Sequence, residues 1–208
     1  MAVITAPIVI ALVMLNWFTT VAGAIWLIVL GEWLPLIAGV IAAVVSPLAL
    51  GFIVLPGRLL FGISGARLFC KGRLLLGLSF IILGLFYIHF VVTAWCIVVF
   101  SYFMYKVEGG NLWPLAFWSY TVATAPLFCM AEKDIKAGSG EGSAITVFFA
   151  QIAYLVMAGA AILYGWPPID LAALFMTVML FSVLGQTVLA IAFGSEQSRY
   201  AHPAAPRR

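Results

Sequence analysis

Six of the uncharged polar side chains that interrupt the long apolar runs of this chain are its best candidates for chemistry. They are three amides, two threonines and one histidine: Asn16, His89, Thr93, Thr121, Gln151 and Gln186. Each would need a hydrogen-bond partner in hydrocarbon, so we expect all six to face the interior of a helical bundle. Two interpretations follow. The side chains either bond helices to one another, at about 0.6 kcal/mol per contact on average, or form a polar layer around a path for a neutral solute.

His89 is the one readily ionisable side chain among the six. An imidazole ordinarily titrates near neutrality and could relay a proton, but no carboxylate shares an apolar run with it. We therefore favour a neutral histidine bonded to a backbone carbonyl or a threonine. The second histidine, His202, lies near the C-terminus, so we expect no two-histidine haem or metal site and predict no cofactor.

Other catalytic patterns are weak in this sequence. The apolar runs hold no pair of carboxylates for acid–base work, and the nucleophile motif G-x-S-x-G does not occur. Cys70, Cys96 and Cys129 occur singly, which favours small buried hydrophobic side chains over a disulfide framework. The sequence leans against an enzyme without excluding one.

The composition decides the class of protein. The chain has 208 residues, of which 65% are hydrophobic and 8% are charged, whereas soluble domains are about 25% charged. A water-soluble domain is excluded, because such a chain could not cover its surface with polar groups. No basic stripe lies on a soluble face, so we expect no nucleic-acid partner. The sequence predicts an all-α, polytopic membrane protein.

A helix needs about 20 apolar residues to cross a hydrocarbon core of about 30 Å. Six stretches qualify or nearly qualify: 7–30, 34–56, 74–105, 112–131, 144–165 and 169–193. The third would be roughly 48 Å long as one helix, so it must tilt or project from the membrane. We thus predict a six-helix transmembrane domain over residues 1–194. Short connections at 31–33 and 165–168 predict three antiparallel hairpins in series.

The charged residues predict the orientation, because all of them can be placed between the spans. If the N-terminus is inside, the outer segments hold one cation, Lys106, and the inner segments hold nine. The nine are Arg58, Arg67, Lys71, Arg73, Lys133, Lys136, Arg199, Arg207 and Arg208. This bias predicts cytoplasmic N- and C-termini and a place in the plasma (inner) membrane.

Two segments outside the spans carry their own predictions. Residues 57–73 mix basic and apolar side chains, which suits a short cytoplasmic helix lying among the lipid headgroups. We expect its four cations to contact anionic membrane lipids: Arg58, Arg67, Lys71 and Arg73. The cytoplasmic tail, 195–208, lacks an apolar period and should be disordered or become ordered only on a partner.

Three function classes remain open from the sequence. The first is a small transporter or channel for a neutral or weakly polar solute, which would pass through the polar layer. The second is a non-catalytic subunit or scaffold that binds other membrane protein subunits or a second copy of itself. The third is a membrane-embedded enzyme. A water-filled centre reaching His89 would favour the first class, and a dry centre would favour a purely adhesive role for the polar residues.

Overall fold

The computed structural model describes residues 2–106, 112–136 and 140–200. Over these ranges the chain is helical outside short turns and contains no strand. The elements are α1 (Ala2–Leu30), α2 (Trp33–Arg58), η1 (Leu59–Gly65), α3 (Ala66–Cys70), α4 (Leu74–Ser101), η2 (Tyr102–Lys106), α5 (Leu112–Lys136), α6 (Gly140–Tyr164) and α7 (Pro168–Tyr200). Both η1 and η2 are π-helical. The prediction of an all-α protein is confirmed.

Five helical segments of the described chain are long and apolar enough to cross a membrane. They are Ile10–Leu30, Trp33–Arg58, Leu74–Tyr105, Ser143–Tyr164 and Pro168–Val188. Each overlaps one of the expected spans, which supports a membrane-embedded protein. A sixth span and the side of the membrane that each end faces stay predictions. The expected span 112–131 lies on α5, a helix that is long but less apolar than the other five.

The position of α5 explains its lower hydrophobicity. It packs against α1, α2, α4 and α6, so most of its surface is covered by other helices. Ser119, Thr121 and Thr124 are buried there. A helix surrounded by protein does not need an apolar outer face, because its polar side chains find partners on its neighbours.

Glycine in the left-handed conformation ends a helix at three tight reversals. Gly31, Gly72 and Gly165 have φ of 75°, 78° and 62°, a region that side chains with a Cβ rarely adopt. At the first reversal the Glu32 N–H donates to the Leu27 carbonyl at 2.9 Å, the long bond of a Schellman cap. These glycines let consecutive helices fold back on one another.

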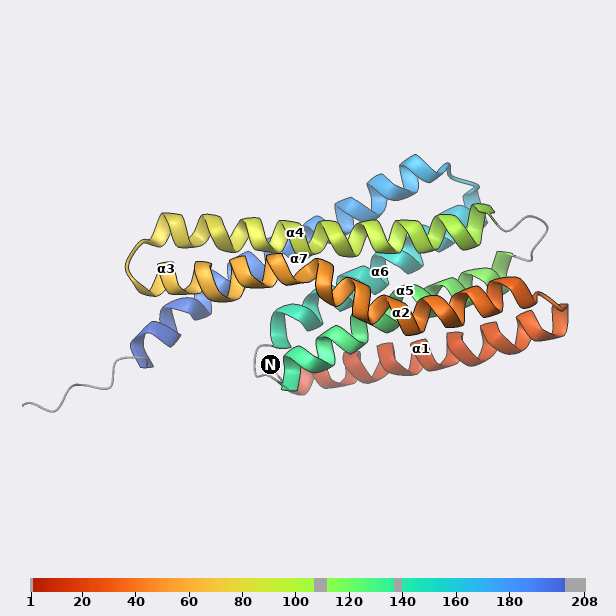
Figure 1. Ribbon diagram of the computed structural model, residues 1–208, viewed down its shortest axis with the longest axis horizontal. Coiled ribbons are helices and arrows are strands. Elements are labelled where there is room, and N and C mark those ends of the chain that lie inside the picture. The colour runs from red at the N-terminus through yellow and green to blue at the C-terminus, as the bar shows by residue number, and fades with distance from the viewer. Residues whose placement is uncertain (1, 107–111, 137–139, 201–208) are drawn as a thin grey trace, which may run out of the picture.

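The reversals sort to the two ends of the bundle (Figure 1). The α1–α2 turn, the start of α5 and the α6–α7 turn lie at one end, on the right of the view. The N-terminus, α3 and the last turns of α7 lie toward the other end. Chain neighbours are not always the main packing partners, since α1 packs far more on α5 than on α2.

The segment 57–73 does not form one short helix separate from its neighbours. Through η1 and α3 it prolongs α2, and both elements pack along the beginning of α4 (Figure 1). Glycines permit this close approach: a Cβ added at Gly77 would lie 2.6 Å from the backbone nitrogen of Phe69. The expected contact with lipid headgroups stays a prediction.

The C-terminal helix is longer than expected. Because α7 continues to Tyr200, it includes the first residues of the tail for which we predicted disorder. No proline interrupts the chain between Pro168 and Pro203, so nothing in that stretch breaks the helix sterically. The rest of the predicted tail, 201–208, lies outside the described residues.

Candidate functional site

Five of the six residues predicted to form one polar layer fall into three separate groups. The α1–α5 cluster consists of Asn16, Thr19, Thr20, Thr121 and Thr124. The histidine cluster consists of His89, Thr146, Ser182 and Gln186. The central polar site consists of Tyr120, Gln151 and Tyr154. The groups differ in one property, which is whether their polar atoms have partners.

The α1–α5 cluster joins an edge helix to the centre of the bundle. The Asn16 side-chain amide donates to Thr124 Oγ1 at 2.5 Å. The Thr121 hydroxyl lies 3.2 Å from that of Thr19 and 3.1 Å from that of Thr20. Thr20 also donates to the Asn16 backbone carbonyl at 2.6 Å. These bonds connect side chains of the two helices to each other, as expected of polar groups between membrane helices.

The histidine cluster connects three helices, α4, α6 and α7. The ring Nδ1 of His89 lies 2.7 Å from the Leu85 carbonyl, which can only accept, so Nδ1 carries the proton. In the neutral ring Nε2 is then an acceptor, and the Ser182 hydroxyl donates to it at 2.8 Å. Gln186 Nε2 donates to Thr146 Oγ1 at 2.6 Å and lies 3.3 Å from His89 Nε2. Both ring nitrogens are therefore occupied by protein groups.

His89 is consequently poorly placed to act on a solute. Its side chain is 4% exposed, and its bond to a backbone carbonyl is the arrangement that the sequence favoured. The described residues hold no group of three or more potential metal ligands. The hydrogen bonds of this cluster join α4, α6 and α7 to one another.

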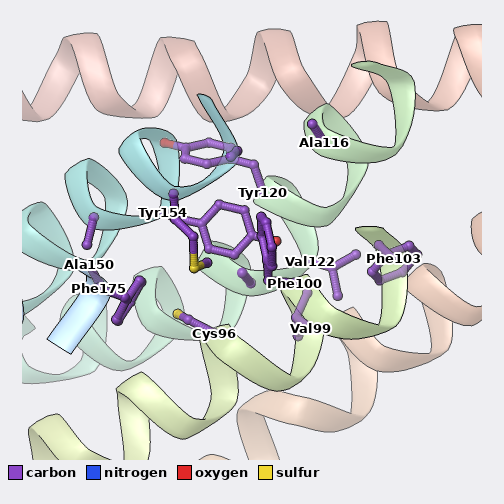
Figure 2. Close-up of a cluster of buried hydrophobic side chains, with 14 of the residues drawn as sticks. Cys96, Val99, Phe100, Phe103, Ala116, Tyr120, Val122, Ala150, Tyr154 and Phe175 are labelled. Carbon is purple, nitrogen blue, oxygen red and sulfur yellow. The ribbon is translucent and has the colours of Figure 1, made fainter. Parts of the chain in front are cut away.

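The central polar site lies where α5 and α6 face each other. Gln151 and Tyr154 are 0% exposed and Tyr120 is 2% exposed. Figure 2 shows the rings of Tyr120 and Tyr154 against each other in the core, with Phe100 beside Tyr154. The Tyr120 and Tyr154 ring centroids are 6.0 Å apart with an interplanar angle of 67°, the edge-to-face geometry that aromatic pairs prefer.

Four polar atoms of the central polar site have no hydrogen-bond partner in the described chain. They are Nε2 and Oε1 of Gln151 and the hydroxyl oxygens of Tyr120 and Tyr154. Ser119 lies beside the Tyr154 hydroxyl without completing a hydrogen bond, and it donates to the Ala116 carbonyl at 3.0 Å. An unpaired buried polar group costs about 1–3 kcal/mol. The site is therefore the least satisfied part of an otherwise well-packed core.

The remaining candidate residues lie outside these groups. Thr93 is buried on α4, one helical turn after His89. Arg67, Lys71 and Arg73 are exposed around the α3–α4 reversal, as contact with lipid headgroups would require. Arg58 is partly buried and makes an interaction of its own.

Sequence reasoning missed Tyr120, Tyr154 and the exposed Trp17. A signal existed for Tyr154, which follows Gln151 by three residues and so lies on the same helix face. Trp17 stood in the middle of an apolar run, away from the interfaces where tryptophan is expected. No pattern in the chain pointed to Tyr120, because its position depends on how α5 packs against α6.

Comparison with known proteins does not assign the site. The chain matches no protein-family model, no curated protein and no solved structure. The functional proposal therefore rests on the geometry of the described residues.

Proposed function

We propose that this protein is a non-catalytic subunit of a membrane complex and that α1 docks on the partner. The observation that carries the proposal is Trp17, whose side chain is 67% exposed. It precedes Leu30, the last residue of α1, by about 20 Å along the helix axis. If α1 crosses the membrane from that end, the indole lies inside a hydrocarbon core of about 30 Å, roughly 5 Å beyond its middle.

An indole at that depth favours a protein partner over lipid. Tryptophan concentrates at membrane interfaces, where its ring and its N–H meet different media. In hydrocarbon the N–H has no acceptor and carries a desolvation cost. At protein interfaces, by contrast, tryptophan is a frequent anchor. A partner helix with a hydrogen-bond acceptor would satisfy the Trp17 N–H.

The rest of the exposed face of α1 supports the same proposal. Five of its exposed apolar side chains recur at alternating spacings of four and three residues: Met14, Phe18, Val21, Ile25 and Ile28. Other apolar side chains of α1 are exposed beside them: Ile10, Val13, Trp17, Trp26, Val29 and Leu30. The alternating spacing of the first five is the heptad period of a seam between two packed helices. Lipid tails would also cover such a face, but they require no particular period.

The transporter or channel is our second candidate function. The closed histidine cluster weakens it, since His89 and Gln186 were expected to line the path and instead engage each other. One observation still favours it, because Gln151 is buried with both ends of its amide unpaired.

Gentle extraction of the tagged full chain tests the subunit proposal. We expect the wild-type protein to bring down a stoichiometric membrane partner or a second copy of itself. Trp17→Leu should lose most of that partner, and Trp17→Phe should lose part of it because the ring remains without the N–H. Phe52→Leu is the matched control, since Phe52 on α2 is 76% exposed and lies on a different face.

Two outcomes would contradict the proposal. One is a monodisperse wild-type protein that carries no partner. The other is an equal loss of partner in Phe52→Leu and Trp17→Leu, which would show that exposed aromatic side chains matter only as membrane anchors.

A further inference from the structure

The reversal between α3 and α4 combines exposed cations with exposed leucines at one end of the bundle. We propose that this reversal binds an anionic phospholipid, with its cations on the phosphate group and its leucines against the acyl chains. Arg58 is not part of the site, because it is partly buried and makes an interaction of its own. The proposal is independent of the subunit function, since it does not use the outer face of α1.

Main-chain hydrogen bonds give the reversal a defined shape. The Lys71 N–H donates to the Arg67 carbonyl at 3.1 Å. The Arg73 N–H donates to the Leu68 carbonyl at 3.2 Å, across Gly72 with its φ of 78°. The cations therefore project from a closed turn, which lies at the left end of the bundle in Figure 1.

The reversal carries positive charge that no acid of the surrounding sequence balances. Arg67, Lys71 and Arg73 are exposed, and no Asp or Glu occurs between Glu32 and Glu108. Arg67 and Lys71 stand one helical turn apart, a spacing at which like charges repel each other. A phosphate group between them would replace this repulsion by attraction, since its oxygens accept charge-assisted hydrogen bonds from both side chains.

The apolar half of the site follows directly after the cations. Leu74, Leu75 and Leu76, at the start of α4, are 57%, 84% and 45% exposed. Together with Gly72 and Arg73 they line a shallow, open groove. Leucines so exposed are unfavourable in water, whereas acyl chains would cover them. Cations beside apolar side chains match the boundary between the headgroups and the tails of a membrane.

The length of the third span agrees with this depth. The apolar segment Leu74–Tyr105 has 32 residues and is about 48 Å long as a helix. An upright helix would leave the first turns of α4 in water, because the hydrocarbon core is only about 30 Å thick. A tilt of about 40° reduces its span across the membrane to about 37 Å, which brings both ends to the headgroups.

These features select the charge and the size of the ligand. A zwitterionic phospholipid carries the same phosphate, but its ammonium group would meet the cations of the reversal. An anionic headgroup avoids that repulsion and gains from each cation nearby. A soluble phosphate ester lacks the acyl chains that would cover the leucines, so it should bind far more weakly than the lipid.

The test measures lipid binding to the full chain in a neutral detergent by native mass spectrometry. Dioleoylphosphatidylglycerol and dioleoylphosphatidylcholine are the probes, because they share their acyl chains and differ in headgroup charge. We expect a Kd about tenfold lower for the phosphatidylglycerol. Glycerol phosphate, added at constant ionic strength, should not displace it.

Two double variants connect the preference to the reversal. Arg67→Gln with Lys71→Gln should raise the Kd of the phosphatidylglycerol about tenfold or more and leave that of the phosphatidylcholine nearly unchanged. Arg207→Gln with Arg208→Gln is the matched control, because it removes the same charge elsewhere in the chain and should keep both Kd values.

A third variant tests the apolar half of the site. Leu75→Ser should raise the Kd of both lipids by a similar factor and keep the preference between them, because acyl-chain contacts do not depend on the headgroup. Since Leu75 is mostly exposed, its replacement should leave the packing of the bundle intact.

Three results would overturn the proposal. The first is an equal Kd of the wild-type protein for the two lipids. The second is an equal loss of affinity in both double variants, which would show that only the net charge matters. The third is displacement of the lipid by glycerol phosphate, which would make the reversal a site for free phosphate esters. None of these results bears on the docking of α1, which is measured by the protein that co-purifies.

Discussion

The histidine cluster and the central polar site are built from similar side chains but behave differently. Both lie deep in the bundle, both include a buried glutamine, and both add hydroxyl groups from a second helix. In the histidine cluster Gln186 donates to Thr146 and His89 is bonded at both ring nitrogens. In the central polar site Gln151 has no partner at either end of its amide.

The difference teaches that burial of a polar side chain does not by itself indicate a function. A closed set of hydrogen bonds stabilises the packing of helices and leaves nothing to offer a ligand. An open set costs stability. The two regions should therefore respond in opposite ways when their polar groups are removed.

The largest expected effect comes from removing the histidine. His89→Ala deletes two hydrogen bonds and leaves a void between α4 and α7, so we expect the free energy of unfolding to fall by about 2 kcal/mol. Denaturant titration in detergent measures this loss. Thr177→Ala is the control, because the Thr177 hydroxyl is exposed and bonds only within its own helix. If the free energy of unfolding falls no more in His89→Ala than in Thr177→Ala, the cluster does not hold these helices together.

A smaller effect is expected in the α1–α5 cluster. Asn16→Leu removes the amide that donates to Thr124, and we expect a loss of about 1 kcal/mol. Because α1 packs mainly on α5, the loss should appear as local opening of α1, seen by faster hydrogen exchange in that helix than in α6. Uniformly faster exchange across both helices would contradict this expectation.

The smallest effect compares two tyrosine hydroxyls. Tyr87 donates to the Ile53 carbonyl at 2.9 Å, so Tyr87→Phe should cost about 0.6 kcal/mol. Tyr120→Phe removes a hydroxyl without a partner and should cost nothing or stabilise the protein slightly. Thermal melting of the two variants under the same conditions checks this order of stability. A larger loss of stability in Tyr120→Phe than in Tyr87→Phe would contradict the prediction.

The apolar runs were enough to predict an all-helical chain with membrane-compatible helices. They also predicted that the six candidate polar side chains face the interior: Thr93, Thr121 and Gln151 are buried, and Asn16 is half-buried. Those predictions succeed because hydrophobic run length and unpaired polar groups act locally along the chain.

The hydrogen-bond partners of these side chains could not be predicted, because they come from helices distant in the chain. Asn16 meets Thr124, which lies 108 residues away, and His89 meets Ser182, which lies 93 residues away. Short turns determine which helices follow one another but not which ones pack best. The central polar site could not be predicted for the same reason, since it depends on the contact between Tyr120 of α5 and Tyr154 of α6.

A matched pair of glutamine substitutions tests the central claim most directly. Gln186→Leu and Gln151→Leu are purified, and their free energies of unfolding are measured under the same conditions. We predict that Gln186→Leu loses about 1–2 kcal/mol because it leaves bonded neighbours unpaired, whereas Gln151→Leu is neutral or more stable than the wild type. A Gln151→Leu protein destabilised as much as Gln186→Leu would show that both glutamines bond helices together and would contradict the account.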